Sequence, residues 1–122
     1  MTQLTFERLA TQLPAGSIEF VGNNQVKINC SILTGDNINL SSSIVEALAK
    51  LLRGAATLND EINNERQQQG KQPINFVEQT INAYGDSQNQ STLMSFTCSI
   101  QVNTGSYIEN LIDPSSDDTQ TN

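Results

Sequence analysis

The stretch SSSIVEALAKLLRGAATLNDEINNERQQQG, residues 41–70, has apolar residues at helical spacing over most of its length. Ser43 and Glu46 have the spacing of a capping box, in which the serine oxygen accepts from a backbone amide and the glutamate reaches back. Gly70 is suited to the left-handed position that follows many helices. The sequence therefore predicts one long helix over residues 43–69.

The apolar residues of this helix gather on one side and become sparse toward its end. In the first half they form a face wide enough to cover a sheet, and a subset has the spacing of a coiled-coil seam. We expect core packing, with a seam that also meets a second subunit as the alternative. After Leu58 only Ile62 continues the face, so the last turns project into solvent, rest on a partner or fray. The seam residues are Ile44, Leu48, Leu51, Ala55, Leu58 and Ile62.

Two stretches on either side of this helix resemble one another. INCSILTGDNINL, residues 28–40, and FTCSIQVNTGSYIENL, residues 96–111, share Cys-Ser-Ile, Thr-Gly and Ile…Asn-Leu in the same order. Each continues an alternating strand that follows a turn containing glycine, Gly22 or Gly85. We interpret the pattern as an internal hairpin duplication, with coincidence as the alternative, because alternating strands resemble one another easily.

The fold class that follows is α+β. A short helix capped by Thr5 precedes a β-β-α-β-β arrangement, with an antiparallel sheet of about four strands and the long helix packed on its apolar face. Residues 74–84 suit a strand or a helix, and the sequence leaves open whether the two hairpins share one sheet. We expect residues 1–112 to form a single domain and the acidic residues 113–122 to be a disordered tail.

Charge and composition weigh against several function classes. The chain has 122 residues, a net charge of −7, six scattered basic residues and no histidine. Nucleic acid and anionic membrane surfaces recruit clustered Lys and Arg, so neither is expected as a ligand. Without histidine or a catalytic motif, we expect no enzymatic activity and no cofactor. The N-terminus lacks the pattern of a secretory signal and no apolar run spans a bilayer, which predicts a cytoplasmic protein.

Few residues are candidates for a functional role. Cys30 and Cys98 alternate with apolar neighbours, so we expect inert core thiols within strands. We interpret the acidic end of the long helix as a solvated face and not as a cation site, because it lacks the pattern of a calcium loop. It is also where the first hypothesis below would place a partner. Tyr84 and Tyr107 would line a ligand pocket between sheet and helix. The candidate partner-binding residues are Asp60, Glu61, Asn64, Glu65 and Arg66.

Three hypotheses of function remain. The first is a small non-enzymatic protein-binding or assembly module that forms a homodimer, because the helix outlasts its apolar face and sheet edges stay open to pair across a two-fold. The second is a small-molecule (metabolite) sensor that uses the tyrosine pocket. The third is an acidic regulatory inhibitor whose tail, with Asp113, Asp117 and Asp118, imitates an anionic ligand.

Overall fold

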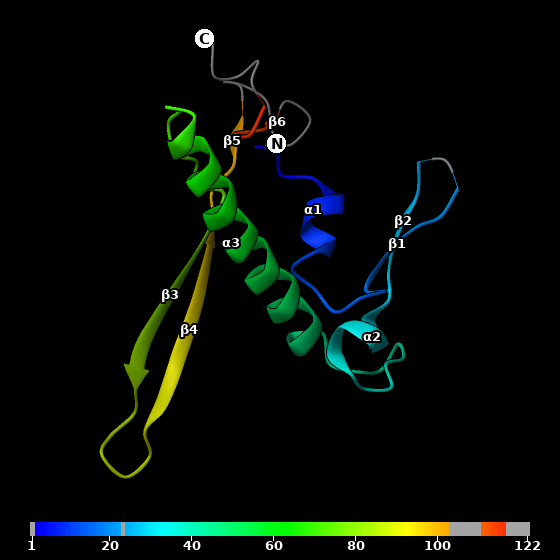
Figure 1. Ribbon diagram of the computed structural model, residues 1–122. Helices are drawn as coiled ribbons and strands as arrows, with labels where there is room; N and C mark the ends of the chain where they lie inside the picture. Colours follow the sequence, from blue (N-terminus) through cyan, green and yellow to red (C-terminus); the bar gives the residue numbers. More distant parts are fainter. Residues whose placement is uncertain (1, 23, 103–110, 117–122) are drawn as a thin grey trace. The chain divides into compact units, whose positions relative to one another are not determined.

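The computed structural model describes residues 2–22, 24–102 and 111–116, and Figure 1 shows its helices and strands. The chain has an α+β fold with one long helix and antiparallel strand pairs. It divides into two compact units. The N-terminal unit is Leu4–Leu58, and the C-terminal unit is Asn59–Asn122 together with Met1–Gln3.

The short predicted helix at the start of the N-terminal unit is confirmed. Helix α1 spans Phe6–Ala10, and the side chain of its N-cap Thr5 accepts from the Arg8 amide at 3.2 Å. The residues that follow lie against the long helix α3, Val45–Gln68, at its single glycine. A Cβ at Gly54 would stand 2.8 Å from Cδ2 of Leu13, so glycine at this position lets the two segments approach closely.

The first hairpin is confirmed but shorter than expected. Strand β1, Ile18–Phe20, pairs antiparallel with β2, Val26–Ile28, in the register Ile18 to Ile28 and Phe20 to Val26. The alternating pattern predicts a strand that continues through Ile32. That prediction is wrong, because the chain turns into a helix directly after Ile28.

Helix α2 spans Cys30–Thr34 and replaces the end of the expected strand. The Asn29 side chain accepts from the Ile32 amide at 3.1 Å, which satisfies one of the free donors at a helix start. The helix ends at the C-cap Gly35. The first Cys-Ser-Ile is therefore helical, whereas the second begins at the last residue of a strand, so the proposed duplication does not extend past the two hairpins.

Substitution of the Asn29 cap tests this helix directly. Asn29→Ala is expected to lower the free energy of unfolding by about 1 kcal/mol, the usual cost of removing an N-cap. Asn29→Asp keeps a capping oxygen and should stay close to wild type. Chemical denaturation of both variants gives the comparison, and equal stability of the two would contradict the assigned cap.

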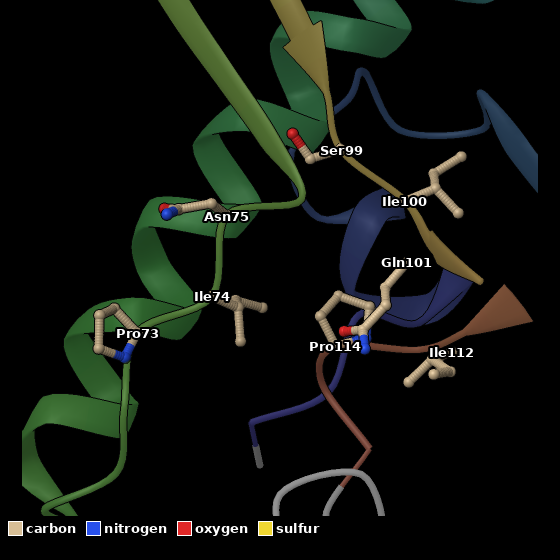
Figure 2. A pocket seen from close by; sticks show the side chains of 8 residues that line it. All are labelled: Pro73, Ile74, Asn75, Ser99, Ile100, Gln101, Ile112 and Pro114. Carbon is tan, nitrogen blue, oxygen red and sulfur yellow. The ribbon is translucent and has the colours of Figure 1, made fainter. Parts of the chain in front are cut away.

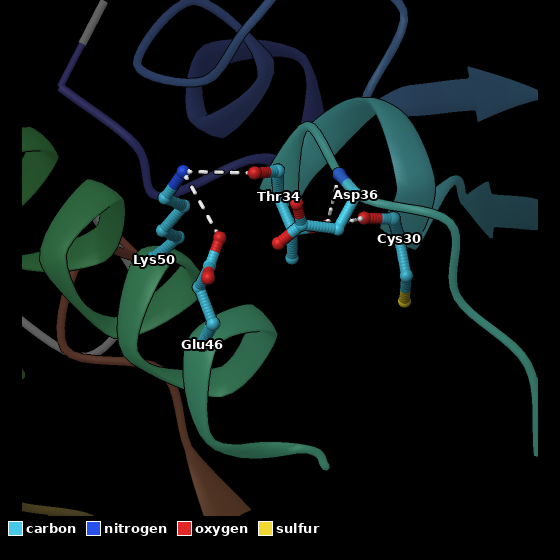
Figure 3. Close-up of polar contacts among 5 residues, drawn as sticks. All are labelled: Cys30, Thr34, Asp36, Glu46 and Lys50. Atoms are coloured by element: carbon cyan, nitrogen blue, oxygen red, sulfur yellow. Dashed lines mark hydrogen bonds and ion pairs between the residues drawn. The ribbon is translucent and has the colours of Figure 1, made fainter. Parts of the chain in front are cut away.

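The long helix is confirmed over Val45–Gln68, and Gly70 follows it with φ of +72°. Its start differs from a capping box. The Ser43 hydroxyl accepts from the Val45 amide at 3.1 Å, while Glu46 pairs with Lys50 at 3.5 Å (Figure 3). The Lys50 ammonium also donates to the Thr34 carbonyl at 3.4 Å, which links α3 to the end of α2.

The burial of α3 runs opposite to the expectation from its apolar pattern. Near its start, Ile44 is 73% exposed and Val45 and Leu48 are exposed as well. In its second half one side of the helix is buried, and the buried residues include two polar ones, Asn59 and Arg66, beside Ile62. The buried apolar residues that the structure describes are Ile18, Leu33, Ala56 and Leu58 in the N-terminal unit and Ile62, Ile74 and Val77 in the C-terminal unit.

The second hairpin is long and regular, and it settles residues 77–84 as a strand. Strand β3, Val77–Tyr84, pairs antiparallel with β4, Ser91–Cys98, over eight residues of each strand. The turn requires glycine at residue 85, where φ is +94° and a Cβ would collide with the Asn89 carbonyl. Beyond the hairpin, β5, Gln101–Val102, pairs with β6, Leu111–Ile112.

The expected four-stranded sheet is not formed by the described residues, whose strands pair only two by two. Alternation identifies the two faces of a strand but not its neighbour. In the first hairpin the Asn29 cap ends the pairing after three residues, which leaves little edge for a further strand. Of the predicted tail, residues 113–116 hold a turn in which the Asp113 carboxylate accepts from the Ser115 amide at 2.8 Å, and residues 117–122 lie outside the described residues.

Candidate protein-interaction surface

Two asparagines of α3 hold the segment that leads into the second hairpin. The Asn59 side-chain oxygen accepts from the amides of Phe76 and Val77 at 2.9 and 3.3 Å, and its nitrogen donates to the Ile74 carbonyl at 3.1 Å. One turn later, Asn63 accepts from the Ile74 amide and donates to the Ile74 carbonyl, both at 2.8 Å. These two side-chain amides thus form hydrogen bonds with the backbone of residues 74–77, as a neighbouring strand would.

Arg66 extends the same row by one more turn. Its side chain is 0% exposed, and its Nε donates to the Gln72 carbonyl at 2.6 Å. We call Asn59, Asn63 and Arg66 the helix clamp. Their spacing of four and three residues places them on one helix face, and together they fix residues 72–77 along α3 within the C-terminal unit. The base of the β3–β4 hairpin is thereby anchored, and Val77 is buried there.

Beyond this anchored base the hairpin has one apolar face. Side chains alternate across a strand, and the β3–β4 register fixes which residues share a face. Ile81 is 55% exposed and stands opposite Met94, which is 40% exposed, while Phe96 is half-buried. None of the residues on this face is charged. We call the following set the apolar hairpin face: Val77, Gln79, Ile81, Ala83, Thr92, Met94, Phe96 and Cys98.

The opposite face of the hairpin is mostly polar. It contains Glu78, Thr80, Asn82 and Tyr84 of β3 and Ser91, Leu93, Ser95 and Thr97 of β4. A two-stranded hairpin is at best marginally stable in water unless something packs on it. Isolated exposed apolar residues are common on protein surfaces, but here they are aligned on one uncharged face of the hairpin, which makes this face a candidate interaction surface.

An open cavity of about 510 Å³ lies in the C-terminal unit, near the hairpin's base (Figure 2). Its volume is within the range of small-molecule sites. One wall comes from the segment held by the helix clamp and another from the chain after β4. A hydrogen bond joins the two walls, because the Ser99 amide donates to the Phe76 carbonyl at 2.9 Å. The lining is uncharged: Pro73, Ile74, Asn75, Ser99, Ile100, Gln101, Ile112 and Pro114.

The structure separates the five residues predicted to bind a partner. Asp60, Glu61 and Asn64 are exposed on α3, and Glu65 is half-buried. Arg66 is buried in the helix clamp, so it is not part of their exposed surface. Among the residues that the structure describes, no group of three His, Cys, Asp or Glu side chains is arranged to hold a metal ion.

Of the two tyrosines predicted to line a ligand pocket, only Tyr84 lies among the described residues. Tyr84 ends β3 and is 62% exposed, and it does not line the cavity near the hairpin's base. Tyr107 lies outside the described residues. Of the acidic residues proposed for an inhibitory tail, Asp113 forms the turn described above, and Asp117 and Asp118 lie outside the described residues.

The expectation of two core thiols is wrong, and of the two cysteines only Cys98 lies in a strand. Cys30 is the first residue of α2 and half-buried, and Cys98 is the exposed last residue of β4. Conversely, sequence reasoning missed Asn59 and Asn63. The sequence pattern that indicates their burial is the position of the two asparagines, one turn apart on the helix face that also contains Leu58 and Ile62.

No helix within residues 2–22, 24–102 and 111–116 is both long enough and apolar enough to cross a membrane. No family model matches the chain, and no curated protein or solved structure is significantly similar to it.

Proposed function

We propose that this protein is a small non-enzymatic protein-binding or assembly module, homodimeric in solution, that associates through the β3–β4 hairpin. The observation that carries the proposal is the apolar hairpin face, which is open along most of its length while its base is anchored by the helix clamp. An anchored arm presents its surface with little loss of conformational freedom on binding, which favours association.

The physical driving force is the burial of apolar area. Covering a side chain such as Ile81 or Met94 contributes roughly 1.5–3 kcal/mol when burial is complete. The chain carries a net charge of −7, yet the apolar hairpin face carries none of it. Association through this face therefore avoids the like-charge repulsion that much of the remaining surface would bring.

A pair of substitutions tests the proposal. Met94→Asp and Thr80→Asp add the same charge to exposed positions of the hairpin, one on the apolar hairpin face and one on the opposite face. We expect Met94→Asp to abolish self-association in analytical ultracentrifugation and Thr80→Asp to leave it close to wild type. Matching melting temperatures would show that both variants fold. Equal association of the two variants would contradict a role for the apolar hairpin face.

A second candidate function follows from the cavity near the hairpin's base. Its size and uncharged lining suit a small neutral ligand, which corresponds to the sensor hypothesis with a different pocket. Ligand binding to the folded state would raise the melting temperature according to ligand concentration. A screen of uncharged metabolites by thermal shift, repeated with Ile100→Arg to fill the cavity, tests this candidate; a shift that survives in the variant would place the ligand elsewhere.

A further inference from the structure

We propose that two copies of this protein join along the outer edge of β4, antiparallel about a two-fold axis at Ser95, to form a continuous four-stranded sheet. This inference rests on the proposed function and names its partner and its geometry. In the described structure β4 is paired on one side only, with β3. A strand edge of this kind presents unpaired amide and carbonyl groups to any strand that reaches it.

The edge of β4 differs from the other described strand edges. Natural proteins guard open edges with charged residues, prolines, bulges or very short strands. Strands β1, β2 and β3 each contain a charged residue, Glu19, Lys27 and Glu78, and β5 and β6 have two residues each. Strand β4, STLMSFTC, has eight residues and contains no charge, proline or glycine. It is thus the long unguarded edge of the described chain.

The absence of charge favours a second copy as the occupant. With a net charge of −7, the protein would use its acidic residues to recognise a different, positively charged partner. Strand β4 contains no acidic residue, so it is not suited to such a partner. Two copies of the same acidic chain meet most easily where neither carries charge. An antiparallel pair of identical strands also satisfies the closed two-fold symmetry that most homodimers adopt.

The side chains of β4 favour one register. Residues opposed in an antiparallel pair share a face. With Ser95 opposite itself, Met94 stands opposite Phe96 of the second copy, and this contact occurs twice. Sulfur–aromatic contacts of this type are favourable. Centring the axis on Met94 or on Phe96 instead gives a single pair of large apolar residues. The Ser95 register also joins the apolar hairpin faces of the two copies into one.

The contact is directional but not large. Eight residues of β4 span about 26 Å, and edge pairing of that length buries less than the roughly 800 Å² per partner of a standard interface. We therefore expect a weak dimer, whose population rises with protein concentration. A disulfide bond between the two copies can trap it.

Disulfide trapping tests the register. In a full-length background with Cys30→Ser and Cys98→Ser, Ser95→Cys places two thiols at the two-fold axis, within disulfide reach across the strand pair. Thr80→Cys is the matched control, because Thr80 is the β3 partner of Ser95 and shares its face. In the proposed sheet the two Thr80 positions lie three strand spacings apart, about 14 Å. We expect disulfide-linked dimer in several-fold excess for Ser95→Cys; equal yields would overturn the proposal.

A second pair of variants needs no oxidation. Ser95→Lys would oppose two like charges at the axis and should shift sedimentation to the monomer, whereas Thr80→Lys should leave the dimer in place. If Ser95→Lys has no effect while Met94→Asp still abolishes association, pairing through the β4 edge is overturned and the protein-binding function stands. If none of these variants changes association, the inference and the proposed function fail together.

Discussion

Asn59→Ala is expected to lower the free energy of unfolding by about 3 kcal/mol, because the substitution leaves buried backbone groups without their partner. The Asn59 side chain is 3% exposed and bonds the amides of Phe76 and Val77 and the carbonyl of Ile74. Asn63 still donates to that carbonyl, so the two amides account for most of the loss. Chemical denaturation at neutral pH measures the difference.

Asn64→Ala is the matched control for this prediction. Asn64 is on the same helix and exposed, so its removal should change the free energy of unfolding by no more than about 0.5 kcal/mol. A loss of equal size in both variants would mean that helix propensity, and not the bonds to residues 74–77, sets the effect of Asn59. That result would remove the basis for the helix clamp.

Arg66→Glu is expected to be at least as damaging, with a loss of about 4 kcal/mol, because it places an unpaired carboxylate in a buried position. The Arg66 side chain is 0% exposed and donates from Nε to the Gln72 carbonyl at 2.6 Å. A carboxylate cannot donate to that carbonyl and would repel it. We expect a lower midpoint in denaturant, and in thermal melts a lower transition temperature.

The control for Arg66→Glu is Asp60→Lys, a charge reversal at an exposed position of the same helix. It should leave the free energy of unfolding within about 0.5 kcal/mol of wild type, as surface substitutions usually do. The contrast matters for the residues predicted from sequence to bind a partner. If Arg66→Glu left stability unchanged, Arg66 would be available to a partner after all, and its place in the helix clamp would be wrong.

Much of the local structure can be predicted from the sequence. The long helix follows from apolar spacing that ends before Gly70, and Thr5 marks the start of the short one. Both hairpins follow from period-two alternation around turns that contain Gly22 and Gly85. These signals are local, because each depends on residues within a few positions of one another.

The failures come from competition between local signals and from tertiary structure. At residues 29–35 the alternation of Val26, Ile28 and Cys30 favours a strand, but an asparagine cap and a glycine stop favour a helix, and the helix forms. The number of strands in a sheet depends on contacts between distant segments, which alternation does not specify.

The helix clamp was missed because its residue types usually face solvent. The end of α3 is polar on all sides in the sequence pattern, because it contains Asn59, Asn63 and Arg66. Their burial becomes favourable only because the segment 72–77 supplies carbonyl and amide partners. A sequence pattern records the polarity of a side chain but not the partner that satisfies it.

Amide hydrogen exchange in β4, followed residue by residue over a range of protein concentrations, tests the central claim most directly. In a hairpin alone, alternate amides of β4 point away from β3 and exchange rapidly. If two copies pair through this edge, these outward amides around Ser95 should become slow as concentration rises, while the inward amides change little. Rapid exchange of the outward amides at every concentration would contradict pairing through β4.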